Sequence, residues 1–62
     1  MNPFKKGDVL IYTGPYDPFL TSGEAYKCSE VDGHTTALTL PNKDRWWTHT
    51  KWLTYAEERL ML

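Results

Sequence analysis

Residues 24–40 read EAYKCSEVDGHTTALTL, and this stretch predicts two β-strands joined by a tight turn. Asp32 and Gly33 stand in its middle, and an Asp-Gly pair favours the short turns of β-hairpins because both residues tolerate positive φ angles. After the turn, Thr36, Leu38 and Leu40 share one face, since successive side chains of a strand point to opposite sides. The hairpin therefore indicates an all-β fold and supplies two of its strands.

The first strand of this hairpin carries an irregularity. Tyr26 and Cys28 share a face, whereas Val31 falls out of phase with both of them. One extra residue in a strand shifts the alternation in this way, so we expect a β-bulge near Ser29 and Glu30.

Two more strands flank the hairpin. Residues 9–13 form an apolar, partly β-branched run bounded by turn-forming residues, and residues 45–50 are rich in aromatic and β-branched side chains. The second of these strands follows a turn cluster at residues 41–44. Residues 14–23 contain two prolines and two glycines, which predict a long irregular loop of the kind that is often functional.

The C-terminal part differs in kind from the strands. Thr54 and Glu57 stand three residues apart, as in a helix capping box, and a single 3₁₀ turn near residues 51–53 is an alternative. Too few residues remain for a helix that is stable alone, so this element must pack on the strands or on another chain. We expect a short C-terminal helical turn.

These elements predict a single domain of residues 1–62, folded as a small, partly open barrel of four to five antiparallel strands. The one cysteine, Cys28, cannot form a disulfide within the chain. A core this small therefore depends on its aromatic residues, which number three Trp, four Tyr and two Phe.

Three segments follow a pattern known from one family. Residues 4–9 place a Gly-Asp pair before the first strand, residues 21–28 contain Gly, Tyr and then Cys at an aliphatic position, and residues 46–53 join a Trp pair to Trp-Leu. Together they resemble small SH3-like domains, particularly those that bacteriophages and bacteria carry as stand-alone genes. The resemblance covers residues 4–55 and implies an SH3-like barrel, a fold that hosts peptide-binding, nucleic-acid-binding and structural roles.

Charge and hydropathy exclude some classes of function. Seven Lys and Arg residues against eight Asp and Glu residues give a net charge of −1, which disfavours strong electrostatic binding to nucleic acid. No apolar stretch is long enough to span a membrane, and the first residues lack the apolar run of a signal peptide. With one free thiol, the expected location is the cytoplasm, or the host cytoplasm if a phage encodes the chain.

Catalytic and metal-binding side chains are few. Cys28, His34 and His49 are the candidates for a thiol–imidazole pair or a metal site, but they lie 6 and 15 residues apart. Structural zinc sites use four ligands at short paired spacings, and Cys28 falls in mid-strand where a small buried side chain is expected. We expect no catalytic residue, no metal and no cofactor.

The aromatic residues carry the strongest functional signal. Because neighbours on a strand point to opposite faces, Trp46 and Trp47 cannot both enter one core. Trp and Tyr side chains concentrate binding energy at protein interfaces. We therefore predict a small protein-interaction module, not an enzyme, that binds a host or self protein; its expected anchors are Tyr12, Tyr16, Phe19, Trp46, Trp47 and Trp52. The competing interpretation is that these rings plug the open ends of the barrel.

Two other functions remain open at this point. Lys43, Arg45 and Lys51 lie close in sequence to the tryptophans, and basic residues interleaved with aromatic rings can bind single-stranded nucleic acid or RNA. The apolar C-terminal residues offer a surface for a homo-oligomer instead; they are Leu60, Met61 and Leu62.

Overall fold

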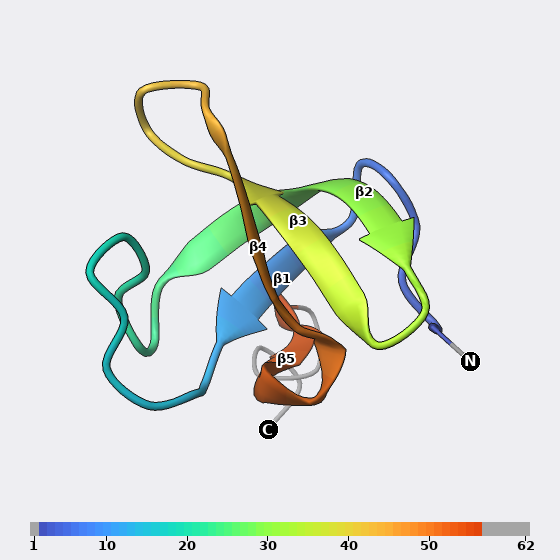
Figure 1. The fold of residues 1–62 in the computed structure, drawn as a ribbon, viewed down its shortest axis with the longest axis horizontal. Coiled ribbons are helices and arrows are strands. Elements are labelled where there is room, and N and C mark those ends of the chain that lie inside the picture. The colour runs from blue at the N-terminus through green and yellow to red at the C-terminus, as the bar shows by residue number, and fades with distance from the viewer. Residues whose placement is uncertain (1, 57–62) are drawn as a thin grey trace.

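The computed structural model describes residues 2–56, which form five strands and one 3₁₀ turn. The strands make one antiparallel sheet in the order β4-β3-β2-β1-β5 (Figure 1). The elements are β1 Val9–Tyr12, β2 Ala25–Asp32, β3 Thr35–Thr39, β4 Arg45–His49, the 3₁₀ turn Thr50–Trp52 and β5 Leu53–Tyr55. The all-β prediction and the expected number of strands are confirmed.

The β2–β3 hairpin has the predicted irregularity. Cys28 pairs with Leu38, but the next pair joins Glu30 to Ala37, so one residue of β2 has no partner in the ladder. This β-bulge returns Val31 to the face that Cys28 occupies, and Val31 packs against the core. The bulge predicted near Ser29 and Glu30 is confirmed.

The core lies inside the curl of the sheet. Four of its strands contribute buried side chains to one cluster, which also includes residues of the N-terminal segment and of the first loop. Its members are Phe4, Leu10, Tyr12, Leu20, Cys28, Leu38, Leu40 and Leu53. Because strands from both edges of the strand order surround the same cluster, the sheet is curled and not flat (Figure 1).

The N-terminal segment is tied to the end of the sheet by Asn2. Its amide nitrogen donates to the hydroxyl oxygens of Thr36 (2.9 Å) and Thr50 (3.1 Å), and its side-chain oxygen accepts from the backbone N–H of Phe4 (2.9 Å). The ring of Phe4 meets Tyr55 edge to face, with centroids 4.9 Å apart. These contacts hold Phe4 in the core.

Of the two helical elements considered for the C-terminal part, the structure describes the 3₁₀ turn. Within the described residues, the alternative of a single 3₁₀ turn near residues 51–53 is the one found, at Thr50–Trp52, and this turn precedes β5. Thr54, the expected helix cap, lies within β5 and pairs with Ile11. Glu57 and the apolar residues at 60–62 lie outside the described residues. Within residues 2–56 no helix is long and apolar enough to cross a membrane.

Two buried threonines of the core face allow a matched test of hydroxyl burial. Thr48 Oγ1 has no hydrogen-bond partner within residues 2–56, whereas Thr36 Oγ1 bonds both Asn2 and Thr50. An unsatisfied buried hydroxyl costs free energy, so Thr48→Val should stabilise the fold by about 1 kcal/mol. Thr36→Val should destabilise it by about 1–2 kcal/mol, because two partners lose a hydrogen bond.

Urea unfolding, followed by Trp fluorescence, measures both free energies of unfolding. Equal m-values are required for the comparison, since they show that the two variants expose the same surface on unfolding. A loss of stability in Thr48→Val as large as that in Thr36→Val would show that Thr48 has a partner.

Candidate functional site

The first loop, residues 13–24, is fixed at both ends by core residues. The N–H of Thr13 donates to the carbonyl of Trp52 (2.7 Å), and the N–H of Gly23 donates to the carbonyl of Tyr12 (2.7 Å). The Tyr12 hydroxyl donates to the carbonyl of Pro15 (2.5 Å), which fastens the loop from inside. The loop is therefore irregular but anchored.

Phe19 and Trp46 form an aromatic contact between this loop and the sheet. Their ring centroids lie 4.4 Å apart, at an interplanar angle of 55°. Asp17 holds both residues, because its carboxylate accepts from Trp46 Nε1 (3.2 Å) and from the backbone N–H of Phe19 (2.8 Å). Phe19 remains 53% exposed and Trp46 is half-buried, so the pair presents apolar surface to solvent.

The adjacent tryptophans of β4 lie on opposite faces of the sheet. Trp46 pairs with Leu38 and packs against the core, while Trp47 pairs with the buried Ala37 on the outer face. Trp47 is 41% exposed. The prediction that one member of this pair is exposed is confirmed, and the split also separates Trp47 from the Phe19–Trp46 pair.

The remaining predicted anchors divide between surface and core. Tyr16 is 92% exposed at the loop, whereas Tyr12 is buried in the core cluster. We therefore correct the placing of Tyr12 on the surface: β1 is apolar on both faces, and its Tyr12 side points inward. Burial raises the pKa of the Tyr12 phenol, and the charge of Asp17 raises it further. Trp52 is half-buried and meets Tyr12 edge to face, with centroids 6.5 Å apart.

At Gly14 the backbone of the first loop passes close to the rings of Tyr12 and Trp52. A Cβ atom at this position would lie 2.7 Å from Trp52 Cγ and 2.7 Å from the Tyr12 hydroxyl oxygen. Tyr12 belongs to the core cluster and Trp52 packs against it, so a shift of either ring would disturb the core. Only glycine fits the loop between these rings.

Gly14→Ala should therefore destabilise the domain by about 1–3 kcal/mol, because the methyl group overpacks a filled site. Thermal unfolding followed by circular dichroism measures the change. Ser22→Ala is the control, since Ser22 is exposed in the same loop and should alter the free energy of unfolding by less than about 0.5 kcal/mol. Equal stability of the two variants would contradict the predicted steric role of Gly14.

Along β4 and the residues on either side of it, every second position from 43 to 51 carries a basic residue or Trp47. Lys43, Arg45, His49 and Lys51 are exposed, as is Trp47 in their middle. We call these five residues the β4 row. The sequence predicted Lys43, Arg45 and Lys51 as basic binding residues, whereas His49 was considered only for a thiol–imidazole pair or a metal site, although it shares their period of two from 43 to 51.

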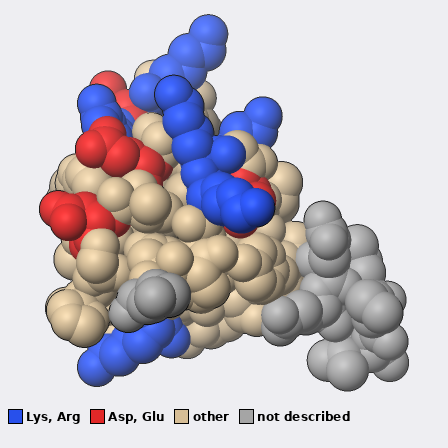
Figure 2. Space-filling model, turned by 90° about the vertical axis from the view of Figure 1, so that its right-hand side faces the viewer, with Lys and Arg blue, Asp and Glu red and all other residues tan. Residues whose placement is uncertain are grey.

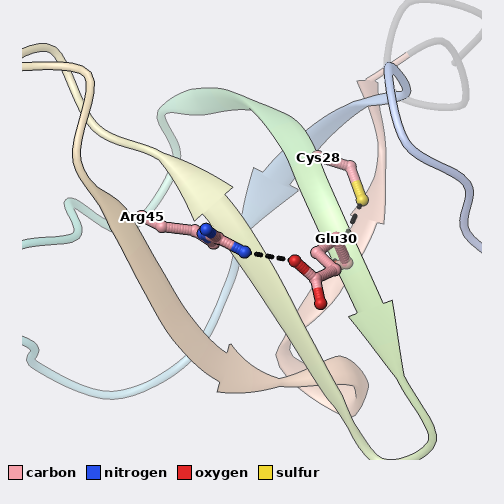
Figure 3. Close-up of polar contacts among 3 residues, drawn as sticks. All are labelled: Cys28, Glu30 and Arg45. Atoms are coloured by element: carbon pink, nitrogen blue, oxygen red, sulfur yellow. Dashed lines mark hydrogen bonds and ion pairs between the residues drawn. The ribbon is translucent and has the colours of Figure 1, made fainter.

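Two charged side chains of the β4 row already have contacts within the protein. Arg45 forms an ion pair with Glu30, so its side chain crosses β3 to reach β2 (Figure 3). Lys51 Nζ lies 5.7 Å from the centroid of the Trp52 ring, a cation–π distance. On the face shown in Figure 2, basic and acidic side chains are intermingled, so this face has no large area of one sign.

The candidate catalytic cysteine does not lie with the two candidate histidines. Cys28 is buried in the core, and its Sγ lies 3.8 Å from the carbonyl oxygen of Glu30 (Figure 3). His34 and His49 line a shallow depression of about 490 Å³ with Gly33, Thr50 and Lys51. In the part of the chain that the structure describes, no three His, Cys, Asp or Glu side chains are grouped to hold a metal ion.

Burial raises the pKa of the Cys28 thiol, and the negative charge of Asp8 raises it further. The native thiol should thus react with iodoacetamide about 100-fold more slowly than in urea, because reaction waits for an opening of about 3 kcal/mol. The raised pKa also predicts a loss of stability as the pH rises above about 9, since the unfolded thiol ionises first. Cys28→Ala should lose less stability over that range. Equal labelling rates in both states would contradict the burial.

Comparison of the chain with protein-family models, with curated proteins and with solved structures finds no match. The candidate site residues form two exposed features: the Phe19–Trp46 pair with the first loop, and the β4 row on the outer face.

Proposed function

We propose that this sheet is an SH3-like barrel, of the kind that phages and bacteria encode as stand-alone domains, acting in the cytoplasm. Four features support the assignment: five antiparallel strands, the order β4-β3-β2-β1-β5, a long loop between β1 and β2, and a 3₁₀ turn between β4 and β5. The sequence resemblance over residues 4–55 points to the same fold. Function does not follow from the fold, so it is argued from the surface.

We propose that the protein is a non-catalytic interaction module that binds a host or self protein. The observation that carries this proposal is the exposure of large aromatic side chains: Tyr16 is 92% exposed, Phe19 53% and Trp47 41%. Full burial of a large apolar side chain stabilises a protein by about 1.5–3 kcal/mol relative to leaving that side chain exposed. This small domain has few large apolar side chains to spare. A partner that covers the rings recovers that free energy.

The first loop is the proposed docking side. Phe19 is supported from below by Trp46, and both are held by Asp17. Anchors that are already ordered lose little conformational entropy on binding, so they bind more tightly than mobile side chains. Tyr12 and Trp52 act beneath this surface by fixing the loop, not by touching the partner.

The double variant Tyr16→Ser/Phe19→Ser tests this proposal. Immobilised protein captures binding partners from bacterial extract, and mass spectrometry with titration of the captured partner compares the variants. The double variant should weaken binding about 30-fold or more, as truncation of interface hot spots does. Its free energy of unfolding should fall by no more than about 1.5 kcal/mol, since both side chains are exposed.

Val9→Thr is the matched control, because Val9 is also an exposed apolar residue but lies on β1. It should bind like the wild type. Equal capture by the double variant and the control would reject the loop as the docking side. If the double variant fails to fold, the rings are needed as plugs of the barrel, and the interaction proposal loses its basis.

A further inference from the structure

β4 is an edge strand of the described sheet, with β3 as its single neighbour there. Two hydrogen bonds bracket the β3–β4 ladder: the N–H of Leu40 donates to the carbonyl of Asp44, and the N–H of Thr50 donates to the carbonyl of His34, each at 2.8 Å. Pairs that exchange hydrogen bonds alternate with pairs that do not along an antiparallel ladder. The bracketing bonds therefore determine which residues of β4 bond to β3.

By this alternation Trp46 and Thr48 bond to β3, while Arg45, Trp47 and His49 turn their N–H and C=O groups away from it. Outside the strand ladders and the 3₁₀ turn, the backbone bonds within residues 2–56 involve none of these three residues. His49 is the N-cap of that turn, so its C=O accepts a bond there, and its N–H is the group left for an added strand. Such an edge is a template for one more strand, which would form main-chain hydrogen bonds with it.

The same positions carry the β4 row. Arg45, Trp47 and His49 point to the outer face, where Trp47 is 41% exposed, and Lys43 and Lys51 continue the row beyond the strand. A strand added to β4 would place every second side chain opposite a basic, an aromatic and a basic residue in turn. Opposite charges and apolar pairs directly across an antiparallel pair are the stabilising combinations.

The charges of the row argue against a second copy as the added strand. Antiparallel pairing of two copies that uses all three free positions centres on Trp47 and sets Arg45 opposite His49 of the second copy. No acidic side chain then faces Arg45 within this pairing, and the same register brings Lys43 of each copy toward Lys51 of the other, so like charges meet.

Nucleic acid fits the row less well than a peptide does. Glu30 is ion-paired with Arg45, Asp44 stands beside it, and the whole chain has a net charge of −1. Phosphates gain nothing specific from a row of alternating N–H and C=O groups, whereas a peptide backbone matches both.

We propose that the β4 edge binds an extended acidic peptide segment by antiparallel strand addition. The segment carries Asp or Glu at positions i and i+4, opposite Arg45 and His49, and an apolar residue at i+2, opposite Trp47. Glu30 competes with the segment for Arg45, since it already occupies that guanidinium. This inference rests on the proposed interaction function and supplies a partner class for a surface separate from the first loop.

The test peptide is TETVTET, with TKTVTKT as its charge-reversed control, and binding is measured by NMR titration of the labelled protein. The acidic peptide should bind at least about tenfold more tightly than the basic one. It should also slow hydrogen exchange of the Arg45, Trp47 and His49 amides, because each gains a hydrogen bond. Equal binding of both peptides, or unchanged exchange at these amides, would overturn the proposal.

Charge variants separate the row from general electrostatics. Arg45→Gln should weaken binding of TETVTET about threefold or more, the size of an exposed ion pair, whereas Lys6→Gln, an equal charge change at an exposed N-terminal position, should leave it unchanged. Glu30→Gln should tighten binding, because it frees Arg45. Equal weakening by Arg45→Gln and Lys6→Gln, or weakening by Glu30→Gln, would contradict a specific contact.

His49 allows a test of the backbone itself. Its φ of −69° suits proline, and its N–H points away from β3, so His49→Pro should preserve the fold. His49→Ala removes the imidazole alone, while His49→Pro also removes the outward N–H. His49→Pro should bind TETVTET about fivefold more weakly than His49→Ala, the effect of one hydrogen bond. Equal affinities would exclude strand addition.

The alternative occupants give distinct results that would each overturn the proposal. Preferential binding of oligothymidylate with a steep salt dependence would assign the row to nucleic acid, and a dimer that Arg45→Gln strengthens would assign it to a second copy. The variant Tyr16→Ser/Phe19→Ser should bind TETVTET normally. Failure of the peptide, with loop-dependent partner capture intact, therefore rejects this inference without rejecting the interaction function.

Discussion

Between Cys28 and Glu30, β2 carries one residue more than β3, and the curl of the sheet follows from this bulge. Residues 25–27 of β2 pair with β1, whereas residues 30–32 pair only with β3. β2 thus bends where it passes from one neighbour to the other. The bulge also returns Val31 to the core face; without it, the register would turn Val31 to solvent and leave the core of a very small domain incomplete.

Tyr12 pairs with Leu53 on the neighbouring strand β5, which sets Trp52 beside Tyr12, and these two residues hold the first loop. The Tyr12 hydroxyl and the Trp52 carbonyl bond the start of the loop, and Gly14 passes between the two rings where no Cβ would fit. The loop needs no secondary structure of its own, because buried groups determine its path. Phe19 therefore reaches Trp46 from an ordered backbone, which is the arrangement that a binding surface requires.

The alternation of side chains along the sequence predicted the features of the fold that depend only on residues close together in the chain. The hairpin, the bulge and the split of Trp46 from Trp47 all follow from the period of a strand, and the structure has each of them. The burial of Tyr12 was not predictable in this way, because β1 is apolar on both faces and only the curl decides which face becomes the core. Likewise, the pairing of Thr54 with Ile11 was not predictable from the local pattern, because it depends on β1, which lies far away in the sequence.

The β4 edge is open to unwanted strand pairing, and the basic side chains of the β4 row oppose that pairing. A free edge with an exposed Trp47 invites pairing between copies, and basic side chains on an edge strand oppose it, because like charges meet when two copies align. The basic side chains that repel a second copy of the chain attract an acidic segment. The charges that disfavour a second copy therefore select acidic strands, and the ion pair from Glu30 to Arg45 sets how strongly they do so. On this view, protection of the edge and choice of partner rest on the same few residues.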